Sequence, residues 1–181
     1  MVEDTLVRGY HGTSRLAAEQ ILGEGFRISR MDYDWLGDGA YFFQEGPRRA
    51  RDWAIRRHAN DGVVLVAVIE IVDCVDLLDP EWASTVHAAY DGFLAARLAN
   101  GAMLPRQTSG ARRLDREVIN YLVEQILVPG GMRVRSVRSS CREGDPVFPG
   151  SALFDLDHIQ IAVRDLSVVK SVRLEATDDE S

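Results

Sequence analysis

The chain has 181 residues, of which 46% are hydrophobic and 27% are charged, a composition typical of a globular domain that excludes a disordered or collagen-like chain. Its net charge of −7 argues against a protein whose whole surface binds nucleic acid, because phosphate binding needs a positive surface. Cys74 and Cys141 lie far apart without C-x-x-C spacing. The sequence therefore predicts neither a zinc site nor a disulfide framework, and fits a reducing compartment.

Nothing in the sequence suggests a membrane segment. No apolar run approaches the roughly 20 residues needed to cross a bilayer, and residues 1–15 lack the apolar centre of a signal peptide. No internal repeat or Pro/Ser-rich linker divides the chain. We therefore expect a cytoplasmic protein with one domain over residues 1–175, followed by a flexible acidic tail over residues 176–181.

Apolar periodicity and turn residues predict the secondary structure of the first 72 residues. Ser14 is a suitable N-cap for a short helix that Gly23 and Gly25 would end. Two glycines before Tyr41 and its aromatic neighbours suggest a tight turn into a buried strand. The expected elements are a strand at 5–10, a helix at 14–22, a turn and strand at 37–43, a helix at 47–59 and a strand at 63–72.

The second half of the chain mixes longer helices with short strands. The expected elements are a helix at 81–98, a break at 100–110, a helix at 114–127, strands at 132–137, 158–163 and 168–172, and a hairpin turn at 164–167. Helices interleaved with strands of unequal length predict an α+β fold rather than a regular βαβ repeat.

Three polar segments remain once the common catalytic motifs are excluded. The chain contains no G-x-G-x-x-G, no P-loop, no G-x-S-x-G and no H-E-x-x-H motif. The first segment, 10–13, places His11, Gly12 and Thr13 at a strand end, where the glycine would let a ligand approach the backbone. The alternative is that His11 is a surface or capping residue.

The other two segments lie at 34–43 and 157–165. In the segment at 34–43, the glycines would let the chain bend under a flat ligand, and Tyr41 would offer a ring face for stacking. The alternative is that the aromatic residues of this segment only fill the core. In the third, strand alternation places His158, Gln160 and Ala162 on one face, as expected for a strand that lines a cleft or for an edge strand facing solvent.

Together and in this order, the three segments resemble the ADP-ribosyltransferase superfamily of the diphtheria-toxin and poly(ADP-ribose)-polymerase type. The similarity lies in His-Gly-Thr on the first strand, Gly-x-Gly-x-Tyr-Phe followed by a helix, and a late strand that carries a third residue. It extends over residues 10–164 and is greatest to small bacterial single-domain members. The resemblance implies a split β-sheet core with packed helices that binds NAD as a substrate.

The resemblance assigns roles to matching positions. His11 would hold a ribose hydroxyl, Gly12 would bind the nicotinamide amide through its backbone, and Thr13 would add a hydroxyl contact. Tyr41 would stack on the nicotinamide ring. Gln160 stands where the family usually has its catalytic glutamate, so it would keep an oxygen acceptor without the charge that stabilises the developing cation. The implied catalytic residues are therefore His11, Tyr41 and Gln160.

The function implied by this resemblance is mono-ADP-ribosyl transfer from NAD to a macromolecular acceptor, a protein or a nucleic acid. Small proteins of this type are often toxins or defence effectors, which implies a neutralising antitoxin as a partner. One alternative with the same fold is an NAD glycohydrolase, with water as the acceptor. Another is a non-catalytic NAD or ADP-ribose-binding module, which the missing carboxylate favours. Asp157, Glu143 and Asp38 are the nearest carboxylates in sequence that would deprotonate an acceptor.

Arginines gather in three stretches, at 48–57, 106–116 and 133–142. If the chain does not belong to this family, these clusters suggest a small nucleic-acid-binding protein. The simpler alternative is that most of these arginines are solvated or paired groups on the surface. The polar loop expected at 139–146 precedes the third segment. It would contact an acidic acceptor or the NAD pyrophosphate, or be only a solvated turn.

Overall fold

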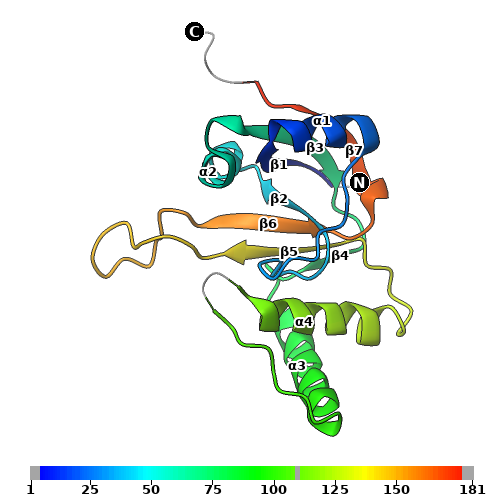
Figure 1. Cartoon of the computed structure of the whole chain (residues 1–181). Helices are drawn as coiled ribbons and strands as arrows, with labels where there is room; N and C mark the ends of the chain where they lie inside the picture. Colours follow the sequence, from blue (N-terminus) through cyan, green and yellow to red (C-terminus); the bar gives the residue numbers. More distant parts are fainter. Residues whose placement is uncertain (1–4, 109–110, 177–181) are drawn as a thin grey trace.

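A mixed β-sheet with the strand order β4-β5-β6-β2-β1-β3-β7 organises the computed structural model of the protein (Figure 1). The structure describes residues 5–108 and 111–176. The strands are β1 (Leu6–Ser14), β2 (Ala40–Gln44), β3 (Gly62–Glu70), β4 (Cys74–Asp76), β5 (Ser136–Cys141), β6 (His158–Val163) and β7 (Val169–Leu174). Neighbouring strands are antiparallel, except that β4 and β5 are parallel. The expected α+β class is confirmed.

Within residues 5–108 and 111–176, four α-helices pack on this sheet. They are α1 (Arg15–Glu24), α2 (Pro47–His58), α3 (Trp82–Ala99) and α4 (Arg113–Tyr121), and the π-helical turn η2 (Leu122–Leu127) continues α4. Two 3-10 turns, η1 (Ala59–Asp61) and η3 (Leu166–Val168), complete the elements. The Ser14 hydroxyl accepts a hydrogen bond from the Ala17 backbone N–H and so caps α1 as predicted. Among the described residues, none of the helices has the combination of length and apolar character that a bilayer crossing requires.

Side-chain alternation along β2 divides the core between the two faces of the sheet. Phe42 packs with residues of α1, β3 and β6 on one face. Phe43 points to the other face, where it packs with Tyr10 and with Ala50 of α2. The helices α3 and α4 cover the part of this second face that β4, β5 and β6 form, around the fully buried Leu122 (Figure 1). Both faces of the sheet are therefore covered. A ligand-binding cavity is expected only where neighbouring strands or helices separate.

The first strand is longer than expected. β1 extends to Ser14, and each of its nine residues pairs with β3, so His11, Gly12 and Thr13 lie within the strand and not beyond its end. The reason is the long apolar run of β3, which offers a partner along this whole length. Pairing of β1 with β2, by contrast, is confined to Gly9 with Gln44 and Tyr10 with Phe43. Beyond Tyr10 the two strands separate.

Two expectations for the second half were wrong. The strand expected at 132–137 lies at Ser136–Cys141, because pairing with β6 begins at Ser136, whereas Met132 is 45% exposed. Part of the loop expected at 139–146 is therefore strand. The turn at 164–167 does not close a hairpin, because β6 already pairs on both edges with β2 and β5, and β7 pairs with β3 instead.

Two further expectations touch residues that the structure does not describe. Residues 177–181 of the expected acidic tail lie outside the described residues, and so do residues 109–110 of the expected break between the two long helices. The expected helix at 114–127 is present as α4 followed by η2.

Candidate functional site

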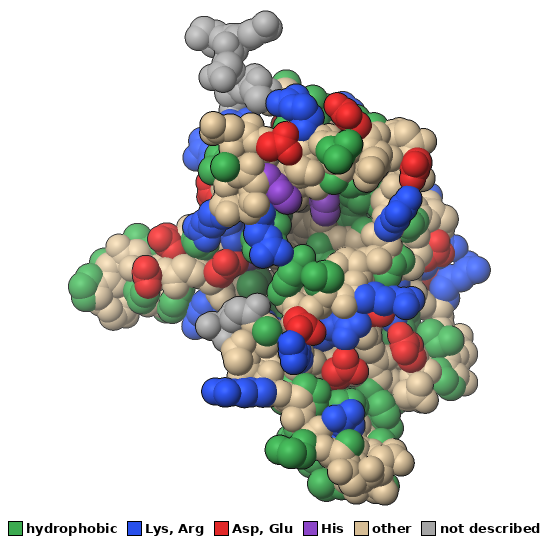
Figure 2. Space-filling view, in the orientation of Figure 1, with side chains coloured by type: hydrophobic (Ala, Val, Ile, Leu, Met, Phe, Trp, Pro, Cys, Tyr) green, Lys and Arg blue, Asp and Glu red, His purple; other side chains and the backbone are tan. Residues whose placement is uncertain are grey.

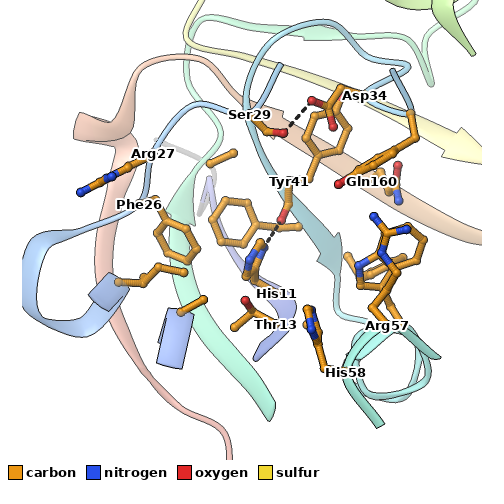
Figure 3. Close-up of a pocket in the computed structure, with 18 of the residues that line it drawn as sticks. His11, Thr13, Phe26, Arg27, Ser29, Asp34, Tyr41, Arg57, His58 and Gln160 are labelled. Atoms are coloured by element: carbon orange, nitrogen blue, oxygen red, sulfur yellow. Dashed lines mark hydrogen bonds between the residues drawn. The ribbon is translucent and has the colours of Figure 1, made fainter. Parts of the chain in front are cut away.

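A cavity of about 590 Å³ opens where β1 and β2 separate, within the range of small-molecule binding sites (Figure 3). His11, Gly12, Thr13, Tyr41 and Gln160, the residues singled out in the sequence, all line it. Figure 2 shows this hollow in the surface, with histidine side chains inside it. The fold therefore brings together three segments that are separated by about 30 and 120 residues of chain.

His11 spans the gap between the separated strands. Its Nδ1 lies 2.8 Å from the backbone carbonyl oxygen of Tyr41, so a side chain replaces the ladder bond that the strands no longer make (Figure 3). A carbonyl oxygen only accepts, so Nδ1 carries the proton and Nε2 presents a lone pair. Burial lowers the pKa of His11, which keeps the imidazole neutral at neutral pH. The ring packs edge-on against Phe26 at 5.2 Å. His11 thus offers one fixed acceptor.

Tyr41 is held by its hydroxyl. The Leu36 backbone N–H donates to the Tyr41 hydroxyl at 2.9 Å, and the hydroxyl donates to the Gly37 carbonyl oxygen at 2.7 Å. Burial raises the pKa of the Tyr41 phenol, so the group is neutral. With both hydroxyl bonds made to the preceding loop, the ring is fixed as part of the cavity wall. Its role there is apolar contact and not proton transfer.

Gln160 faces the cavity from β6, and its amide orientation is set by a residue that the sequence did not single out for a role. The Trp35 indole Nε1–H donates to Gln160 Oε1 at 2.6 Å. Because an indole N–H is a donor only, this bond identifies the oxygen of the amide, and it uses one of the two lone pairs of that oxygen. Gln160 therefore keeps one lone pair on Oε1, the oxygen acceptor that the sequence led us to expect, and adds two N–H donors. Trp35 lies beside the motif Gly37–Tyr41, but only the fold shows that it reaches across to β6.

Gly12 packs closely against α2 and also lines the cavity. A Cβ added to Gly12 would lie 2.2 Å from the Ala50 carbonyl oxygen of α2, so glycine is required here because the helix approaches the strand closely. Gly12 lies beyond Tyr10, in the part of β1 that does not pair with β2, so its backbone borders the cavity. Thr13 lies on the same face of β1 as His11 and is 7% exposed.

The glycines of the second segment also serve the fold. Gly37 has a φ of +83°, a left-handed conformation that favours glycine, and a Cβ there would lie 2.6 Å from Asn120 Oδ1. A Cβ at Gly39 would lie 3.0 Å from the Ala162 side chain. These contacts explain why glycine stands at both positions.

Two groups of cavity residues were missed by the sequence analysis. Asp34 is 2% exposed, accepts a hydrogen bond from the Ser29 hydroxyl at 2.7 Å, and has a pKa raised by burial (Figure 3). At the rim, the Arg57 guanidinium lies over the rings of Tyr33 and Trp53, at 4.9 and 5.1 Å from their centroids. Arg57 supplies a positive charge near the cavity entrance, which suits an anionic group of a ligand.

The carboxylates considered as bases differ in position. Glu143 lines the cavity, but its Oε2 pairs with Arg49 at 2.7 Å. Asp38 instead binds Arg116 at 2.7 Å and accepts from the Asn120 amide. Asp157 accepts a hydrogen bond from the Glu143 backbone N–H. Arginines of these clusters, such as Arg49 and Arg116, are therefore paired with carboxylates. This agrees with the expectation of solvated or paired surface groups.

No protein-family model matches the sequence, and no curated protein matches it either. The site combines a neutral histidine acceptor, a fixed tyrosine ring, an amide side chain and a cationic rim around one cavity.

Proposed function

We propose that the protein is a mono-ADP-ribosyltransferase with an ADP-ribosyltransferase-like split sheet, and that the cavity binds NAD. The observation that carries this proposal is that His11, Tyr41 and Gln160 all line one cavity where β1 and β2 separate. These are the three positions to which the resemblance assigns the catalytic set. An apolar ring face with hydrogen-bonding groups around it suits the nicotinamide riboside half of the dinucleotide.

Each residue has a defined part in this proposal. His11 Nε2 accepts a hydrogen bond from a hydroxyl of the nicotinamide ribose. The Tyr41 ring stacks on nicotinamide, and the Gln160 NH₂ donates to a ribose oxygen. Arg57 at the rim faces the pyrophosphate, because a guanidinium recognises phosphate oxygens well. Thr13 adds a hydroxyl contact.

The proposed reaction breaks the N-glycosidic bond between nicotinamide and ribose C1′. Nicotinamide leaves with the bonding electron pair, the acceptor forms a new bond to C1′ through its own lone pair, and the acceptor's proton is released to solvent. Positioning of the two reactants would supply much of the rate enhancement. A charged carboxylate near C1′ would add electrostatic stabilisation, which the neutral amide of Gln160 does not provide.

A non-catalytic NAD-binding module is the second candidate, and the Trp35–Gln160 hydrogen bond favours it. Gln160 is a neutral amide whose Oε1 already accepts one hydrogen bond at 2.6 Å, so the side chain can hydrogen-bond to a sugar but carries no charge. Such a group holds a ribose oxygen without stabilising positive charge on the sugar. This module would bind NAD without releasing nicotinamide.

The test uses NAD labelled separately in nicotinamide and in the adenylate phosphate, incubated with the purified protein, alone and with cell lysate. Release of nicotinamide together with label on protein or nucleic acid supports a transferase and identifies the acceptor class. Release without transfer identifies a glycohydrolase instead, and binding without release identifies the module. Absence of NAD binding overturns all three readings.

Variants at the cavity make this test specific. His11→Ala and Tyr41→Ala should abolish NAD binding or cleavage, whereas His87→Ala on the exposed surface of α3 should not change them. Circular dichroism of each variant separates loss of the site from loss of the fold. Unchanged NAD affinity in both cavity variants contradicts the assignment of this cavity as the NAD site.

A further inference from the structure

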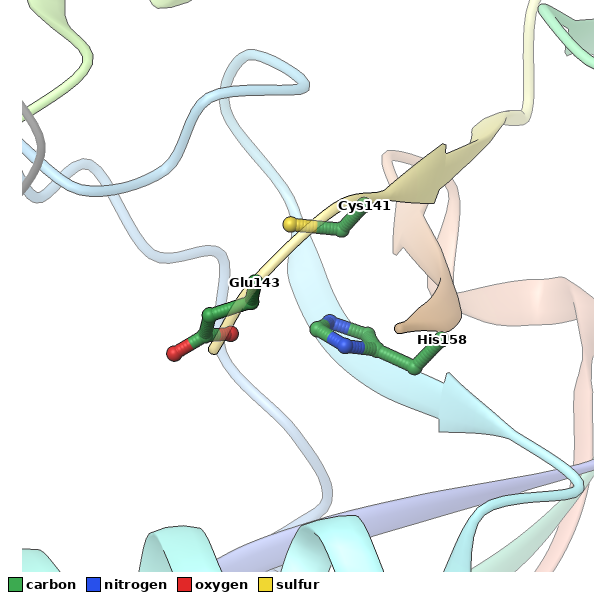
Figure 4. A group of neighbouring side chains, drawn as sticks. All are labelled: Cys141, Glu143 and His158. Carbon is green, nitrogen blue, oxygen red and sulfur yellow. The ribbon is translucent and has the colours of Figure 1, made fainter. Parts of the chain in front are cut away.

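Next to Gln160, the pairing of β5 with β6 builds a second cluster of reactive side chains. Cys141 and His158 are Cα partners across these strands, and Glu143 follows two residues after Cys141 (Figure 4). One ligand atom from each residue lies within 4.8 Å of the others. Cys141 is 6% exposed, and it lines the NAD cavity together with Glu143.

His158 is oriented as a metal ligand. Its Nδ1 lies 2.7 Å from the Leu156 carbonyl oxygen and 3.4 Å from Arg49 Nε. The carbonyl contact is much the shorter and a carbonyl oxygen only accepts, so the proton is on Nδ1 and Nε2 has a lone pair. A histidine that binds a metal usually makes this bond to a backbone carbonyl with its other ring nitrogen. His158 Nε2 is buried and has no hydrogen-bond partner among the described residues. A buried nitrogen without a partner calls for an explanation.

From this geometry we infer that Cys141, Glu143 and His158 form a binding site for one thiophilic divalent cation, with zinc the best match. A sulfur, an imidazole nitrogen and a carboxylate oxygen form a ligand set that zinc accepts, and three protein ligands leave a fourth position for water. Ligand atoms on a tetrahedral zinc lie about 3.5 Å apart, so small side-chain rotations close the site. The fourth position would face the cavity beside Gln160.

The charges around the cluster set the strength of this site. Arg49 pairs with Glu143 Oε2 at 2.7 Å, and Oε1 is not part of that ion pair. The Arg49 guanidinium lies over the Phe43 ring at 5.1 Å, and Arg112 lies over Trp35 at 5.3 Å. Both positive charges oppose a cation. The site should therefore bind zinc less tightly than a closed structural site with four protein ligands.

Metal binding would also change the state of Cys141. Burial raises the pKa of this thiol, so without a cation it remains protonated at neutral pH. Coordination forms the sulfur–metal bond, and the thiol proton is released to solvent. This inference does not rest on the proposed NAD chemistry, because it concerns only the ligand atoms and their surroundings.

Cobalt(II) absorption spectroscopy tests the site directly. The purified chain, first treated with a chelator, is titrated with Co²⁺. We expect one equivalent to produce a thiolate-to-cobalt charge-transfer band and visible bands of tetrahedral cobalt, both removed by Zn²⁺. Cys141→Ser and His158→Gln should abolish the charge-transfer band, whereas Cys74→Ser, the matched control for the other free thiol, should retain it. No band with the unaltered chain, or a band that persists in Cys141→Ser, overturns the inference.

A second measurement does not depend on whether the cysteine variant folds. At pH 9, where part of the buried thiol is ionised, prolonged treatment with iodoacetamide should alkylate Cys141 of the unaltered protein, and zinc should slow this reaction at Cys141 and not at Cys74, as read from peptide masses. Glu143→Gln, a change in a loop, should weaken Co²⁺ binding tenfold or more. Equal alkylation of Cys141 with and without zinc contradicts the site, even if Co²⁺ binds elsewhere on the chain.

Discussion

The imidazole of His11 is bound to the backbone carbonyl of Tyr41 at 2.8 Å, between two strands that have already separated. This one hydrogen bond fixes the histidine tautomer and links the first strand to the aromatic wall of the cavity. Because the bond uses Nδ1, the other ring nitrogen is available to a ligand. The contact therefore joins the fold to the proposed NAD chemistry.

The lowered pKa of His11 predicts a stability that depends on pH. Unfolded histidine titrates near pH 6.5, so below this pH the unfolded chain binds a proton that the folded chain does not. Stability from this group is complete above pH 6.5 and is lost as the pH falls towards the folded pKa. At pH 5.5 the loss is at most about 1.4 kcal/mol.

Urea unfolding at pH 7.5 and pH 5.5 measures this effect. His11→Gln should show a smaller decrease in the free energy of unfolding between the two pH values than the unaltered chain. His87→Gln, an exposed control on α3, should keep the decrease of the unaltered chain. An identical pH dependence in His11→Gln and the unaltered chain means that His11 is not held neutral by burial.

Gly12→Ala should destabilise the protein by about 3 kcal/mol. The new Cβ would lie 2.2 Å from the Ala50 carbonyl oxygen, so β1 or α2 must move. Gly23→Ala is the matched control, because a Cβ there has nothing within 4 Å and the residue lies in α1. That change should stabilise the protein by up to about 1 kcal/mol. Thermal unfolding of both variants checks the pair, and equal melting temperatures contradict the close approach of β1 and α2.

Tyr41→Phe should cost about 1–3 kcal/mol of stability, because the Leu36 N–H and the Gly37 carbonyl lose their partner. The ring remains, so NAD affinity should fall much less than in Tyr41→Ala. Tyr90→Phe on α3 serves as a control, because its hydroxyl has no hydrogen bond within the described part of the chain. Urea unfolding and NAD titration give the two readouts. A Tyr41→Phe variant as stable as the unaltered chain rules out a structural role for the hydroxyl.

Trp35→Phe should release the Gln160 amide by removing the indole N–H at 2.6 Å from Gln160 Oε1. The released amide no longer holds its hydrogen bond to the ribose, and loss of that bond, worth about 1 kcal/mol, predicts an NAD affinity that is about fivefold lower. Trp82→Phe at the start of α3 is the control. Calorimetric titration with NAD decides the outcome, and equal affinity in the two variants argues that Trp35 does not position Gln160.

Gln160→Glu tests the charge at the third position. The carboxylate would keep one oxygen for the Trp35 indole and present the other to the cavity. Within the proposed function, this negative charge next to the cleaved bond should raise the rate of nicotinamide release. A release rate that does not increase would favour the module that binds NAD without cleaving it.

The sequence predicted much of the secondary structure, because the signals are local. Ser14 caps α1, and the expected helices at 47–59 and 81–98 match α2 and α3 within about a residue at each end. The three segments that line the cavity were singled out by residue type, and the resemblance then joined them into one site. Each was weak alone, and only their order in the chain gave them weight.

Features that depend on how strands pair became visible only in the tertiary structure. The length of β1, the start of β5 and the absence of a hairpin between β6 and β7 all follow from which edges were already paired. The same pairing sets Trp35 against Gln160 and Cys141 opposite His158, contacts between residues at least 17 apart in sequence. Residue type and local spacing determined which elements form and which chemistry is present. Long-range hydrogen bonding between strands determined which side chains meet. The reason is that the register of a strand pair depends on both segments, so neither segment alone specifies it.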